Sequence, residues 1–82
     1  MGDAILNEVL YVISGNFRQA ADFAMSREIP RNRLVFVDEP DRLSGISGEG
    51  KTVFVYGTAH SRKDLNDCIH MAMERRFKIE HV

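Results

Sequence analysis

The sequence predicts an α/β fold with a small, three- to four-stranded, mainly parallel sheet and the element order β-α-β-β-α-β. Short apolar runs rich in β-branched residues alternate with segments of helical period, as in parallel sheets whose strands are buried on both faces. Gly, Asn and Pro separate these segments. The 82 residues allow one domain, 1–82, and we expect residues 1–7 to fray at the N-terminus.

The first half of the chain predicts a strand, a helix and a second strand. Residues 9–14 (VLYVIS) are too continuously apolar for a half-exposed strand, so they predict a buried one. Asn16 is a good N-cap for the helix that follows, because phenylalanine and alanine recur over 17–24 at helical spacing. Pro30 cannot continue this helix, and residues 34–37 (LVFV) predict the second buried strand.

The second half predicts a loop, a strand, a helix and an edge strand. The loop covers 41–50 and leads into a third buried strand over 52–56 (TVFVY). A second amphipathic helix is predicted over 61–76, with Ser61 as its N-cap. Residues 77–82 alternate between apolar and polar side chains, a pattern typical of a short edge strand.

Right-handed crossovers restrict how these strands connect. If the chain reverses direction across the sheet after the second strand, the order is 2-1-3-4, as in a Rossmann- or flavodoxin-like half-unit with its helices on opposite faces. One long helix on each face leaves part of the sheet uncovered, and uncovered apolar surface usually recruits a partner. We therefore expect a homodimer or a complex with another protein.

Composition and charge exclude several classes of protein. Hydrophobic residues make up 44% and charged residues 28%, as in ordinary globular domains, and the net charge of -1 gives no general attraction to nucleic acid or membranes. No apolar run approaches the roughly 20 residues that cross a bilayer, and Met1–Asn7 lacks the features of a secretory signal. The single cysteine, Cys68, excludes an internal disulfide, which favours a cytoplasmic location.

Residues 45–52 (GISGEGKT) match the phosphate-binding loop of nucleotide hydrolases, with Gly45, Gly50, Lys51 and Thr52 at the defining positions. That loop functions because a helix follows it and directs its N–H groups at the phosphates. Here the next residues, 53–56, predict a strand. We therefore interpret the match as a flexible turn before a strand, and the sequence favours a protein without enzymatic activity.

A ligand site is predicted where the strand order reverses, because open α/β sheets bind ligands there. The turns after the first and third strands meet at this point, and their helix starts offer N–H groups to an anion. The candidate binding residues are Ser14, Gly15, Asn16, Thr58, His60, Ser61 and Arg62. The alternative interpretation is ordinary strand-to-helix turn chemistry, and a dinucleotide is not expected because the first turn lacks G-x-G-x-x-G.

Other chemistry has little support in the sequence. No residue is assigned a catalytic role, and no cofactor or metal is expected, since the three histidines and Cys68 show no ligand spacing. Nucleic-acid binding stays an alternative because basic residues fall in three groups, although acidic residues lie between them. These groups are Arg27, Arg31 and Arg33; Arg62 and Lys63; and Arg75, Arg76 and Lys78.

Several segments resemble small hypothetical proteins of actinobacterial viruses and prophages. The segments are YVISGN (11–16), QA (19–20), VFVDxPDxLxG (35–45), VFVYGTA (53–59) and RxDL (62–65). The resemblance implies a Rossmann-like fold of unassigned function and a location in the cytoplasm of a bacterial host.

The function predicted from these observations is that of a small binding protein that acts through protein–protein contact. Two alternatives remain: an anion or nucleotide binder, or modest enzyme, at the crevice between the first and third strands, and a nucleic-acid binder.

Overall fold

A computed structural model describes residues 9–82, so the fraying predicted for residues 1–7 lies outside the described part. The sheet has four strands, all parallel, in the order β2-β1-β3-β4. This confirms the predicted α/β fold and the strand order 2-1-3-4. The strands are β1 (Leu10–Ile13), β2 (Leu34–Phe36), β3 (Thr52–Val55) and β4 (Lys78–His81), and the helices are α2 (Phe17–Ser26) and α3 (Leu65–Glu74). Three 3-10 helices complete the described elements: η1 (Arg31–Arg33), η2 (Pro40–Leu43) and η3 (Gly57–Ser61).

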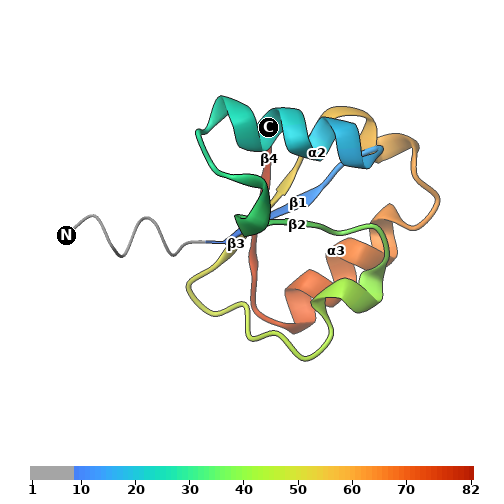
Figure 1. Ribbon diagram of the computed structural model, residues 1–82. Coiled ribbons are helices and arrows are strands. Elements are labelled where there is room, and N and C mark those ends of the chain that lie inside the picture. Colours follow the sequence, from blue (N-terminus) through green and yellow to red (C-terminus); the bar gives the residue numbers. More distant parts are fainter. Residues whose placement is uncertain (1–8) are drawn as a thin grey trace.

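The two α-helices cover opposite faces of the sheet, as predicted (Figure 1). On one face, α2 packs Ala20, Phe23 and Ala24 against Leu10 and Val12 of β1. On the other face, α3 and η2 enclose the larger core. Successive residues of β1 contribute to both cores because side chains alternate across a strand, so all four of its residues are buried.

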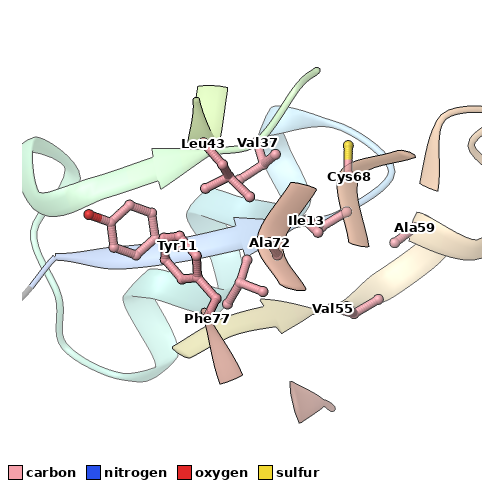
Figure 2. Packing of buried hydrophobic residues seen from close by; sticks show 10 residues of the cluster. Tyr11, Ile13, Val37, Leu43, Val55, Ala59, Cys68, Ala72 and Phe77 are labelled. Atoms are coloured by element: carbon pink, nitrogen blue, oxygen red, sulfur yellow. The ribbon is translucent and has the colours of Figure 1, made fainter. Parts of the chain in front are cut away.

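The larger core joins both ends of the chain's described part (Figure 2). The rings of Tyr11 and Phe77 meet edge to face, with their centroids 5.0 Å apart. Leu43 of η2 lies against this core with no exposed surface, as do Cys68 and Ala72 of α3. The loop before β3 is therefore anchored at Leu43 as well as at its junction with the strand.

Both helices end earlier than the sequence predicts, and for the same reason. We expected the first helix to stop at Pro30, but Glu28 already adopts a left-handed φ of 58° and Ile29 N–H donates to the Ala24 carbonyl. Arg76, with φ 70°, plays the same part after α3. These bonds satisfy carbonyls that the last helical turn leaves free.

The predicted N-cap role of Ser61 is wrong. Ser61 is the last residue of η3, and α3 begins only at Leu65 with Asp64 at its N-cap position. The Asp64 side chain makes no capping bond, because both of its carboxylate oxygens accept hydrogen bonds from Arg62. The segment between β3 and α3 is thus arranged around a guanidinium instead of a helix start.

Candidate functional site

The carboxyl ends of β1 and β3 bring the two predicted turns into contact. The Gln19 side chain lies between them: its Oε1 accepts from the backbone N–H of Gly15 at 2.9 Å and from that of Thr58 at 3.0 Å. Its Nε2 donates to the Thr58 hydroxyl at 3.1 Å. A Cβ atom at Gly15 would overlap that hydroxyl, so this close approach requires glycine. One amide therefore occupies the position where we expected a ligand.

Arg62 fixes the neighbouring part of the same edge. Its Nη1 donates to the Ser14 carbonyl at 3.0 Å and to the Val37 carbonyl at 2.7 Å, which ties the ends of β1 and β2 together. Its Nε and Nη2 donate to the two Asp64 oxygens at 2.9 and 2.8 Å, and Nη2 also contacts the Cys68 sulfur at 3.7 Å. A guanidinium has five N–H donors, and these contacts engage all five.

These contacts shift two pKa values in opposite directions. The hydrogen bond from Arg62 lowers the pKa of the Asp64 carboxyl, and the same bond raises the pKa of the guanidinium. Each group thus holds its partner in the charged form, as expected for a bidentate pair whose arginine side chain is only 12% exposed.

The remaining predicted residues divide into buried and exposed groups. Ser14 is buried and its hydroxyl donates to the Asn16 carbonyl at 2.7 Å, while Asn16 caps α2 by accepting from Gln19 N–H at 2.9 Å. His60 and Ser61 are exposed. The structure therefore brings Ser14, Gly15 and Thr58 together, but in hydrogen bonds within the protein. Anion binding at this edge stays a prediction.

A comparison with known protein families, with curated proteins and with solved structures finds no match. Within residues 9–82, no group of three or more His, Cys, Asp or Glu side chains lies close enough to hold a metal ion. No helix of that same part of the chain is long and apolar enough to cross a membrane.

The phosphate-loop match lies at the opposite, amino edge of the sheet. Lys51 precedes β3, whose first residue is Thr52, so a strand follows the loop as predicted. The Lys51 ammonium donates to the Ser47 carbonyl at 3.0 Å, and Gly45 and Gly50 take left-handed φ values of 81° and 77° to turn the chain. In the described part of the chain, the elements on either side of this loop are η2 and β3, so no α-helix begins directly after it.

We expect the chain to bind neither Mg-ATP nor Mg-GTP at micromolar concentration, because the loop lacks the helix N-terminus that gathers phosphates. Calorimetric titration of the wild type should give no heat beyond dilution. The Lys51→Ala variant is the matched control, since this side chain is exposed and contributes one local hydrogen bond. Micromolar binding that Lys51→Ala removes would contradict this interpretation.

Cys68 is buried in the larger core, and its environment disfavours the thiolate. Burial, with a smaller contribution from the Asp64 charge, raises the pKa of the thiol to about 11. A nucleophilic cysteine needs the opposite shift. The residue is therefore a small core side chain and not a nucleophile.

This raised pKa predicts a loss of stability at alkaline pH. The ordinary pKa is 9.0, so between pH 9 and about 11 the unfolded chain releases the Cys68 proton while the folded chain retains it. The free energy of unfolding should therefore fall across that interval. Urea denaturation at several pH values measures the slope, and Cys68→Ala should make it shallower. Burial also raises the pKa of Tyr11, which both proteins share, so their difference reports Cys68 alone.

On the face of the sheet that α2 covers, the part beyond α2 is partly open in the described structure. α2 lies over β2 and β1 and reaches only Phe54 and Tyr56 at the β3 side, through Phe23 at centroid distances of 5.3 and 4.9 Å. Phe54 pairs with Glu80 of β4, and Thr52 with Lys78, so these charged side chains share that face and are exposed. The Arg27 guanidinium lies 4.7 Å from the centroids of both Phe23 and Phe54. We call Arg27, Phe54, Tyr56, Lys78 and Glu80 the open sheet surface.

A hollow of about 360 Å³ borders the open sheet surface at the amino edge of the strands. Phe54 and Ile29 contribute apolar walls, and Lys51 and Thr52 contribute polar ones. Sequence reasoning expected part of each sheet face to be uncovered, but it did not identify the residues. Its prediction of buried strands at 34–37 and 52–56 is wrong in part, because Leu34–Phe36 and, on β3, Thr52 and Phe54 are only half-buried. The available signal was the two charges that alternate with apolar residues at 77–82.

Proposed function

We propose that the chain is a small binding domain that acts through protein–protein contact, and that the open sheet surface is its contact site. The observation that carries this proposal is that Phe54 and Tyr56 are only half-buried and that the exposed Arg27 places its guanidinium over the Phe54 ring. Tyrosine, phenylalanine and arginine are enriched where protein interfaces are buried most completely. A viral or prophage origin, which the sequence resemblance implies, makes a bacterial host protein the partner to test first.

The chemistry of the carboxyl edge supports binding over catalysis. The side chains that meet there satisfy one another, and the Cys68 thiol is held protonated. In contrast, the open sheet surface combines two half-buried aromatic rings, the exposed Arg27 and a hollow beside them. A protein surface with an apolar projection and a nearby carboxylate complements that combination, because the carboxylate pairs with Arg27 and the apolar group covers Phe54.

An affinity capture from host lysate, with nuclease treatment, tests the proposal. The expected result is a protein that the wild type retains after nuclease and that Arg27→Glu loses. Arg18→Glu makes the same charge change at an exposed position of α2, the helix that Arg27 follows as its C-cap residue; Arg18 lies outside the surface, so this variant should retain the partner. Capture that nuclease abolishes would favour nucleic-acid binding. Equal capture by both variants would remove the open sheet surface from the proposal.

A further inference from the structure

The free edge of β4 suits pairing with a second copy of the chain. β4 is the last strand of the sheet and pairs only with β3 among the described residues. Lys78 and Val82 donate their N–H groups to the β3 side, at the carbonyls of Lys51 and Val55. Backbone groups alternate in direction along a strand, so those of Ile79 and His81 point outward, away from the sheet.

We propose that two copies of the chain pair their β4 strands antiparallel about a two-fold axis at Ile79. In this register Ile79 exchanges both main-chain hydrogen bonds with Ile79 of the second copy. The His81 N–H reaches the Phe77 carbonyl of the second copy in the same way. The result is one continuous eight-stranded sheet, in which the outward groups of β4 in each copy are paired.

The charges of β4 select this register. With Ile79 opposite Ile79, each Lys78 faces Glu80 of the other copy, and these two pairs occupy the non-hydrogen-bonded positions, where side chains lie closer. Within β4, only Ile79 and His81 direct their main-chain groups outward, so other registers must again place outward residues opposite one another. Adjacent registers therefore differ from this one by two residues. The adjacent shift on one side places Glu80 opposite Glu80, and the one on the other side places Lys78 opposite Lys78. Both of those registers repel, so Lys78 and Glu80 give attraction in the Ile79 register.

Charge exchange at exposed positions tests the pairing without removing core contacts, because Lys78 and Glu80 are both exposed. Sedimentation equilibrium of the wild type, from micromolar to millimolar concentration, should show about twice the 9.3 kDa chain mass. Lys78→Glu and Glu80→Lys should each return to the single-chain mass, since each places like charges opposite one another. The double variant Lys78→Glu/Glu80→Lys should form the dimer again.

A mixture of the two single variants gives the sharpest readout. One chain then carries two carboxylates and the other two ammonium groups, so every facing pair is attractive and the mixture should regain the dimer mass. A wild type that stays at the single-chain mass overturns the pairing, as does a dimer that both single variants keep or a mixture that stays at the single-chain mass. Lys78 and Glu80 also belong to the open sheet surface, but Arg27, on which the capture test rests, lies outside β4. The two tests can therefore fail separately: if the wild type has the single-chain mass and still captures a protein that Arg27→Glu loses, only the pairing is overturned.

Discussion

Replacing Arg62 with alanine is expected to lower the free energy of unfolding by about 3 kcal/mol, the largest loss we anticipate from an exchange at the carboxyl edge. The reason is what remains after the exchange. Ser14 and Val37 are both buried, and their carbonyls lose the donor that Arg62 supplies. Asp64 loses its bidentate partner. Urea denaturation followed by circular dichroism measures the effect.

Two further variants separate the causes. Arg42→Ala breaks another arginine–aspartate pair with a 2.7 Å contact, but its side chains are 55% and 42% exposed, so it should scarcely change the unfolding midpoint. Arg62→Lys keeps the charge without the planar set of donors and should fall between wild type and alanine. If Arg62→Ala lowers the free energy of unfolding no more than Arg42→Ala does, the contacts of Arg62 at the carboxyl edge do not hold the strand ends together.

The Arg62→Ala protein should also lose part of its acid sensitivity. Because Arg62 lowers the pKa of Asp64, the pair stabilises the fold above the ordinary carboxyl pKa, and that contribution is lost as pH falls through the lowered one. The difference in unfolding free energy between wild type and Arg62→Ala should therefore shrink toward low pH.

Gly48→Ala is expected to lower the free energy of unfolding by about 2 kcal/mol, although it adds a single methyl group to a loop. Gly48 is buried, its N–H donates to the Arg75 carbonyl at 2.7 Å, and a Cβ atom there would lie 2.6 Å from the Phe77 backbone nitrogen. A backbone atom cannot rotate away as a side chain can. The loop must therefore move, or the Phe77 contact with Tyr11 must open.

Ser47→Ala is the matched control, since Ser47 is the exposed neighbour and only its carbonyl takes part in a hydrogen bond. Its unfolding midpoint should match that of the wild type. Equal midpoints for Gly48→Ala and the wild type would show that this loop does not rest on Phe77. Gly48 stands at a position of the phosphate-loop pattern where any residue is allowed. A loss of stability in Gly48→Ala would therefore show that this glycine is needed for packing, which the pattern does not require.

Apolar continuity explains why the sheet could be predicted from the sequence. Apolar runs such as 10–13 and 52–56 mark the strands, although only the first is buried along its whole length. Crossover rules then restricted the strand order, and a reversal of the chain after the second strand gave 2-1-3-4. The carboxyl edge was harder because its contacts join residues far apart in the chain. Gln19 reads as one polar position of a helix, and only the packing of Gly15 against Thr58 reveals why a long amide is needed there. Ser61 was misassigned for a related reason: local capping patterns cannot show that Arg62 engages Asp64.

The central position of β1 has a consequence for how the chain folds. Leu10 pairs with Leu34, and Tyr11 pairs with Val53, so both neighbours of β1 lie far along the sequence. No pair of strands in the described sheet can form from a hairpin, because each pairing waits for an intervening crossover to close. Such non-local pairing slows folding relative to helical bundles of equal length. During synthesis, β1 emerges before both of its partners, so one edge stays unpaired until β2 has left the ribosome and the other until β3 has.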